Sequence, residues 1–160
     1  MTIKVGDRMP AGKFKVMGED GPKDVSSDEL FKGKRVVLVA VPGAFTPTCS
    51  ARHLPGYVEN VAKFKAKGVD TIACMAVNDV FVMNAWGKDQ KADGKVTMLA
   101  DGSGEYTKAL GLELDLSAGG LGKRSRRFAI VVNDGKVESM ALEEGGALKI
   151  SDAESVLKQV

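Results

Sequence analysis

Two cysteines and one histidine are the side chains of this 160-residue chain best suited to nucleophilic or redox chemistry. Cys49 comes shortly after an apolar, β-branched run at 35–41 and opens a helical pattern. The first turn of a helix presents unpaired N–H groups and a partial positive charge, which favour a thiolate over a thiol. Thr46 and Thr48 could add hydroxyl donors near the sulfur. This setting predicts a reactive Cys49, although an isolated cysteine is more commonly a buried structural residue.

Cys74 is the second thiol, and its position makes it a less obvious reaction partner. It lies inside a strand expected over 69–77, about three residues or roughly 10 Å before the carboxyl end of that strand. Cys49 is expected beyond such an end, so the two Cα atoms should exceed the roughly 7 Å limit for a disulfide. Cys74 is therefore either a small core residue or a partner that requires the first helical turn to unwind.

His53 lies four residues after Cys49 on the same helix face, a spacing that suggests a Cys–His pair. A thiolate that has already formed needs no base, and a structural or pocket-rim role for His53 is favoured. Trp86, the single tryptophan, is expected to pack rather than to react.

The composition excludes several classes of function. One histidine and two cysteines cannot form a zinc site or a disulfide scaffold, so no metal and no bound cofactor are expected. A net charge of +2 gives no reason to expect nucleic-acid or membrane-surface binding. The chain has no apolar run of the about eighteen residues that a membrane span needs. A cytoplasmic protein is expected, or one of an organelle such as a plastid after removal of a targeting segment.

The order of the predicted elements indicates one α/β domain over residues 1–160. Apolar strands alternate with amphipathic helices, and an Asn-Asp-Gly-Lys turn joins the last two strands. Right-handed crossovers would give a mostly parallel sheet with an antiparallel edge and helices on both faces. The sequence predicts strands at 35–41, 69–77, 96–100, 128–132 and 137–142, a helix over 48–67 interrupted by Pro55, and capping boxes at Ser26–Glu29 and Ser151–Glu154.

The segment Val41–Ser50 resembles the active-site loop of the type II (atypical) peroxiredoxins, especially their plant and algal branch. Its Pro-x-x-x-Thr-x-x-Cys pattern is formed by Pro42, Thr46 and Cys49. The resemblance covers nearly the whole chain and includes the segments 53–56, 77–79, 85–87, 100–106 and 121–128. It implies a thioredoxin-like three-layer sandwich with a mixed central sheet.

The resemblance also implies a role for each residue of the motif. Cys49 would be the nucleophile, with Thr46 as a hydroxyl donor and Pro42 shaping the pocket floor. Arg127 matches the family arginine because it directly precedes Phe128, and its planar guanidinium could hold the thiolate and a peroxide oxygen together. Strand alternation places Arg126 on the opposite face, toward solvent. Cys74 is the candidate resolving cysteine, since plant-type members have a second cysteine at this spacing.

A glycine-rich segment, Gly119–Lys123, superficially suggests a phosphate-binding loop. Walker spacing requires glycine at 117 and serine or threonine at 124, where this chain has Ser117 and Arg124. Nucleotide binding is rejected, and a flexible loop that brings Arg127 into position is expected instead.

The expected function is therefore a cofactor-free thiol peroxidase that serves antioxidant defence and redox signalling. Hydrogen peroxide or an alkyl hydroperoxide would oxidise Cys49 to a sulfenic acid, and glutaredoxin with glutathione, or thioredoxin, would restore the thiol. The resemblance further implies a homodimer with contacts near the active-site loops. The alternatives are a redox sensor that is oxidised once without turnover, and a structural module with an unreactive cysteine.

Overall fold

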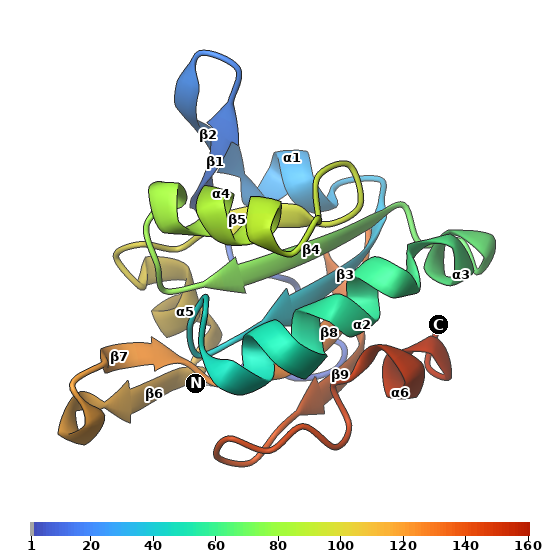
Figure 1. Ribbon diagram of the computed structural model, residues 1–160. Coiled ribbons are helices and arrows are strands. Elements are labelled where there is room, and N and C mark those ends of the chain that lie inside the picture. Colours follow the sequence, from blue (N-terminus) through green and yellow to red (C-terminus); the bar gives the residue numbers. More distant parts are fainter. Residues whose placement is uncertain (1) are drawn as a thin grey trace.

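A seven-stranded sheet, in the order β2-β1-β5-β4-β3-β8-β9, forms the middle layer of the computed structural model, which describes residues 2–160 (Figure 1). Strands β3, β4 and β5 run parallel, whereas β8 and β9 continue the sheet antiparallel on the β3 side. The strands of this sheet are β1 Lys13–Gly18, β2 Gly21–Ser26, β3 Arg35–Ala40, β4 Thr71–Ala76, β5 Thr97–Ala100, β8 Phe128–Asn133 and β9 Lys136–Leu142.

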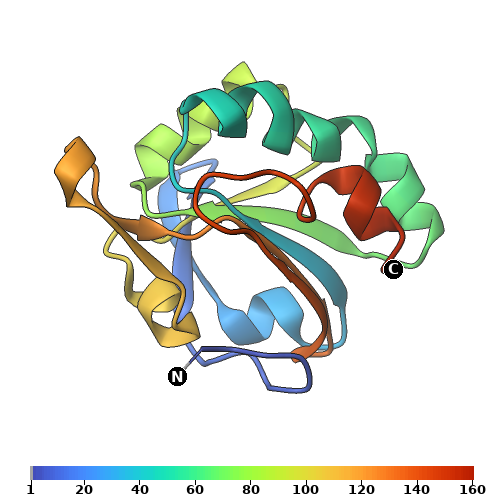
Figure 2. The ribbon, with the colours of Figure 1, turned by 90° about the horizontal axis from the view of Figure 1, so that it is seen from below.

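Helices cover both faces of the sheet (Figures 1 and 2). On β3, Val37 and Val39 belong to one buried cluster, and Val36 and Leu38 belong to the other. The first cluster lies beneath α2 Leu54–Glu59, α3 Val61–Ala66, α4 Val80–Asp89 and α6 Ala153–Leu157, and the second beneath α1 Ser27–Phe31 and α5 Glu105–Leu110. Because β3 is buried on both faces, its near-continuous β-branched run is the pattern expected of a central parallel strand. The predicted three-layer α/β sandwich with a mixed central sheet is confirmed, but the sheet is not mostly parallel, since only the β3–β4 and β4–β5 pairs are parallel.

Two β-hairpins were not predicted from the sequence. The first joins β1 to β2, and its attachment to the rest of the sheet is slight, since β1 pairs with β5 only through Lys15 and Ala100. The second pairs β6 Glu113–Leu116 with β7 Gly122–Ser125 across a short 3₁₀ turn at Ser117–Gly119. The segment Gly119–Lys123, expected to be a flexible loop, is partly regular, because Gly122 and Lys123 belong to strand β7 and Gly119 belongs to the 3₁₀ turn.

The helix expected over 48–67 is broken into three pieces. Cys49–His53 forms a π-helical turn, in which the N–H of Leu54 donates to the carbonyl of Cys49, and α2 begins immediately afterwards. Pro55 has no N–H for the ordinary helical bond, so a widened turn before it is physically reasonable. A second break at Asn60 separates α2 from α3.

One of the two predicted capping boxes is present. Ser26 accepts a hydrogen bond from the N–H of Glu29, and the Glu29 carboxylate accepts one from the N–H of Ser26. The prediction of a capping box at Ser151–Glu154 is wrong, since α6 is capped by Asp152, whose side chain accepts a hydrogen bond from the N–H of Ser155. Ser151 instead serves the site described below. No helix within residues 2–160 is long and apolar enough to cross a membrane.

Candidate active site

Cys49 is the first residue of the π-helical turn, and it follows the loop that leaves the carboxyl end of β3. Its side chain has no exposed surface, because the thiol faces the cluster between the sheet and the helices. Open α/β sheets bind ligands at the carboxyl ends of their strands, so the location agrees with the sequence prediction. Burial alone would equally suit a structural cysteine, and the neighbours of the sulfur decide between the two interpretations.

Arg127 is the polar neighbour of this sulfur. Its Nη2 donates to Cys49 Sγ at 3.3 Å, and its Nη1 lies 3.0 Å from His53 Nδ1. Arg127 is only 3% exposed, and its Nε is the only buried side-chain nitrogen or oxygen in residues 2–160 without a hydrogen-bond partner. An unpaired buried donor beside a cysteine is costly unless a ligand uses it. These contacts separate Cys49 from an ordinary core cysteine.

The hydrogen bonds of His53 fix its tautomer. Nη1 of Arg127 can only donate, so His53 Nδ1 must accept, and Nε2 then carries the hydrogen that it donates to the Ser151 carbonyl at 3.0 Å. Burial is the main cause that lowers the pKa of His53 to about 4, against a raising effect of the Ser151 carbonyl. The imidazole is therefore neutral at physiological pH and acts as an acceptor for Arg127 rather than as a base for Cys49.

The Ser151 carbonyl also accepts the hydroxyl hydrogen of Tyr57 at 2.5 Å. Ser151 lies in the segment between β9 and α6, about a hundred residues after the turn that carries Cys49, and its contribution could not be anticipated from the Ser-x-x-Glu pattern, which suggested a helix cap. Sequence reasoning therefore missed the residue whose backbone positions His53.

The loop before Cys49 is held by hydrogen bonds of its own. Thr46 Oγ1 donates to the Gly43 carbonyl at 2.6 Å, and the Pro42 carbonyl accepts from Arg124 Nη1 at 3.3 Å. A Cβ atom at Gly43 would lie 2.8 Å from Arg124 Nη1, so this glycine allows the guanidinium to approach the loop. Arg124 comes from β7, and its contact with the loop was not predicted.

Trp86 packs as expected, with no exposed surface. Its indole Nε1 donates to the Ser50 hydroxyl at 2.9 Å, which places the chain's single tryptophan next to the residue that follows Cys49. Arg126, expected to face solvent, is half-buried, and its Nη2 donates to the Glu143 carbonyl at 3.0 Å.

Cys74 lies in the middle of β4, where it pairs with Val39 of β3 and Met98 of β5. It has no exposed surface and belongs to the same buried cluster as Cys49, and both thiols are free. Burial, with a smaller contribution from Cys49, raises the pKa of the Cys74 thiol far above its ordinary value. In this state Cys74 is a protonated thiol and a poor nucleophile.

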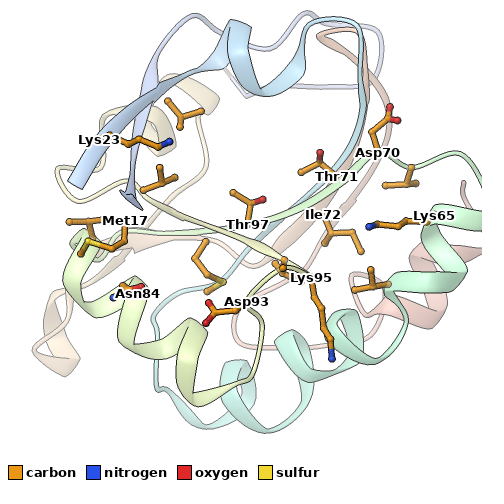
Figure 3. A pocket seen from close by; sticks show the side chains of 18 residues that line it. Met17, Lys23, Lys65, Asp70, Thr71, Ile72, Asn84, Asp93, Lys95 and Thr97 are labelled. Carbon is orange, nitrogen blue, oxygen red and sulfur yellow. The ribbon is translucent and has the colours of Figure 1, made fainter. Parts of the chain in front are cut away.

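A cavity of about 530 Å³ lies elsewhere, between α3, α4 and the β1–β2 hairpin. Thr71 and Thr97, at the amino ends of β4 and β5, line it together with Ile72, Lys65 and Lys95 (Figure 3). Because β3, β4 and β5 are parallel, this is the end of the sheet opposite Cys49. Within residues 2–160, no group of three or more His, Cys, Asp or Glu side chains is placed to hold a metal ion.

Comparisons with known proteins show the family to which this chain belongs. Residues 4–157 match the family model described as Redoxin. The chain is 54% identical over 157 residues to Peroxiredoxin-2C of Oryza sativa subsp. japonica, with 98% of this chain and 97% of the rice protein covered. It is 48% identical to the chloroplastic Peroxiredoxin-2E of Arabidopsis thaliana, with 98% and 69% covered. The crystal structure of reduced Prx3 in complex with H2O2 from Vibrio vulnificus superposes with a TM-score of 0.95, at 46% identity and with 98% of both chains covered.

The fold and these relatives define the class: the chain belongs to the peroxiredoxins, the thioredoxin-fold peroxidases that are oxidoreductases acting on peroxide. Within that class, the chain is similar to the plant type II (atypical) peroxiredoxins, as its identity to the rice and Arabidopsis proteins shows.

Proposed function

We propose that Cys49 is the peroxidatic residue and that Arg127 holds its thiolate and the peroxide. The thiolate sulfur attacks the terminal oxygen of R–O–OH, the O–O bond breaks, and the departing RO⁻ takes up a proton to become water or an alcohol. Cys49 is left as a sulfenic acid. The observation that supports this assignment best is the 3.3 Å contact from Arg127 Nη2 to Cys49 Sγ beside an unpaired Nε donor. A donor that is already in place can stabilise the charge that develops on the peroxide oxygen.

Thr46 and Pro42 complete the proposed site. The hydroxyl hydrogen of Thr46 is committed to the Gly43 carbonyl, so its oxygen retains lone pairs that can accept a hydrogen bond from the peroxide O–H. This favours an acceptor role over the donor role expected from the sequence. Pro42 is half-buried, and a floor at that position would shield the thiolate from bulk water.

We propose that external thiols complete the cycle. One thiol condenses with the sulfenic acid to give a mixed disulfide and water, and a second thiol, from glutathione with glutaredoxin or from thioredoxin, releases Cys49. The buried, protonated state of Cys74 favours this route, since Cys74 would have to leave β4 in order to resolve the sulfenic acid. Resolution by Cys74 would require both this departure from β4 and an unwinding of the turn at Cys49.

A single domain over residues 1–160 and a homodimer are also proposed. Two exposed aromatic rings support the dimer: Phe45 lies in the active-site loop, and Phe81 lies in the first turn of α4. The N–H of Ala44 donates to Asn78 Oδ1 at 2.9 Å, and this bond joins the active-site loop to the segment before α4. Apolar side chains exposed beside a site commonly mark an interaction surface. The compartment is proposed to be the cytoplasm or a plastid, the latter because one relative is named chloroplastic.

Peroxide turnover of the wild type, Cys49→Ser and Cys74→Ser, with glutaredoxin–glutathione and thioredoxin supplied separately, tests the proposal. Loss of turnover in Cys49→Ser alone would support a cycle that uses one cysteine. Loss in both variants with every reductant would show that Cys74 resolves. A single stoichiometric oxidation of the wild type without cycling would favour the redox-sensor function instead.

A further inference from the structure

The segment between β9 and α6 is organised by one buried carboxylate. Glu143 is only 2% exposed, and its Oε2 accepts hydrogen bonds from the N–H groups of Lys149, Ile150 and Ser151 at 2.7–2.8 Å and from Ser151 Oγ at 2.8 Å. Residues 149–151 belong to no helix or strand. The four hydrogen bonds to one carboxylate oxygen therefore fix the path of the backbone there. The position of the Ser151 backbone therefore depends on Glu143.

The backbone of Glu143 is joined to the other side of the site. Its N–H donates to the Arg127 carbonyl at 3.0 Å, and its own carbonyl accepts from Arg126 Nη2. Glu143 thus links the chain that carries Arg127 to the chain that carries Ser151. Burial would raise the pKa of the Glu143 carboxyl, but the hydrogen bonds from Ser151, Ile150 and Lys149 outweigh burial and lower it, so the group is ionised at neutral pH.

The contacts continue from Ser151 to the sulfur. The Ser151 carbonyl accepts from His53 Nε2, His53 Nδ1 accepts from Arg127 Nη1, and Arg127 Nη2 donates to Cys49. Within residues 2–160, the Arg127 guanidinium makes hydrogen bonds to two side chains, those of Cys49 and His53. If the carbonyl moved away, the hydrogen could shift from Nε2 to Nδ1, and two N–H donors would then oppose each other at 3.0 Å.

We infer that Glu143 is a positioning residue for the peroxidatic centre, which acts by fixing the Ser151 carbonyl so that His53 holds Arg127 against the Cys49 sulfur. The inference rests on the proposed role of Cys49. It assigns a function to a carboxylate outside the loop motif that carries the chemistry. Displacement of a catalytic group by about 1 Å can reduce a rate about a hundredfold, so a remote residue of this kind can control activity.

The test combines a rate with a spectroscopic readout. Trp86 fluorescence follows the oxidation of Cys49 by hydrogen peroxide in single turnover, since the indole contacts Ser50. The imidazole ¹⁵N signals of His53, the only histidine, report its tautomer without interference from other residues. Glu143→Gln preserves shape and can still offer one oxygen to the loop N–H groups, but this oxygen is neutral and accepts weaker hydrogen bonds than the carboxylate. Glu144→Gln, at the exposed neighbouring carboxylate, is the matched control.

We expect wild type and Glu144→Gln to show a neutral Nε2–H imidazole and the same oxidation rate. Glu143→Gln should be oxidised at least about tenfold more slowly and show a mixed or Nδ1–H tautomer. An oxidation rate within about twofold of wild type would overturn the inference, as would a slow variant whose His53 signals are unchanged.

Two further measurements keep the inference testable if Glu143→Gln does not fold. Glu143→Asp retains the charge but is one methylene shorter, and the same rate and tautomer criteria apply to it. A wild-type His53 in the Nδ1–H form would refute the proposed contacts without any variant. Failure of the proposed function is distinguishable, because it would appear as a wild-type Cys49 that peroxide does not oxidise while the tautomer remains as described.

Discussion

The neutral state of buried His53 makes the stability of the fold depend on pH in a defined direction. Its pKa is about 4 in the folded protein, against an ordinary value of 6.5. Between these values the unfolded chain binds a proton at this position that the folded chain excludes. Stability therefore rises with pH across this window and is lost as the pH falls from about 6.5 toward about 4.

The size of the effect follows from the same two values. A tenfold change in proton affinity corresponds to about 1.4 kcal/mol, so the complete effect is about 3 kcal/mol. Of this, about 2 kcal/mol should be lost between pH 7 and pH 5. Most carboxylates remain ionised in that range, so His53 should dominate the change.

Urea unfolding followed by Trp86 fluorescence can measure this loss. The wild type should lose about 2 kcal/mol of unfolding free energy between pH 7 and pH 5, whereas His53→Gln, which cannot titrate, should lose little. Phe64→Leu is a suitable control, because Phe64 stacks on Tyr57 at a centroid distance of 5.5 Å and the variant keeps the histidine. It should be less stable throughout but retain the wild-type pH dependence. Equal pH dependence in His53→Gln and wild type would refute the reasoning.

Three other substitutions test the site and its support. Arg127→Lys replaces a planar fork by a point charge that cannot serve both of its contacts, and stopped-flow kinetics should show peroxide oxidation of Cys49 slower by about a hundredfold or more. Gly43→Ala would bring a Cβ to 2.8 Å from Arg124 Nη1, the mobile end of its side chain, and to 3.1 Å from Thr46 Cγ2, so displacement of Thr46 should slow the same reaction, and an unchanged rate would show that Thr46 stays in place. Asp101 accepts bonds from the N–H and hydroxyl of Thr107 at 2.8 and 2.7 Å; Asp101→Asn should lower the unfolding free energy in urea by about 2 kcal/mol.

The central strands and the position of Cys49 were predictable because their signals are local. The run that forms β3 is apolar on both faces, and the Asn-Asp-Gly-Lys turn between β8 and β9 has the residues that such a turn requires. The placement of Cys49 after β3 follows from the order of these elements, and the motif resemblance selected Arg127.

The rest of the site depends on contacts between distant parts of the chain. His53 is 98 residues from Ser151 in sequence, and no local pattern encodes a bond from a side chain to a distant backbone carbonyl. Ser151 also fits a helix-capping pattern, and only the competing acceptor at Glu143 shows why Asp152 caps α6 instead. The π-helical turn was missed for a related reason, since a proline signals a disturbed helix but not the form that the disturbance takes.

The slight attachment of β1 to β5 has a consequence for the order in which backbone amides become accessible to solvent. The β1–β2 hairpin is joined to the sheet through the single pair Lys15–Ala100, whereas β3 is paired along its length with β4 and β8. Segments with few tertiary hydrogen bonds open at a lower free energy than the global unfolding transition. Amides of the hairpin should therefore exchange with deuterium by local opening, while those of β3 and β4 exchange only when the whole domain unfolds, and the active-site end of the sheet stays closed during the hairpin's opening.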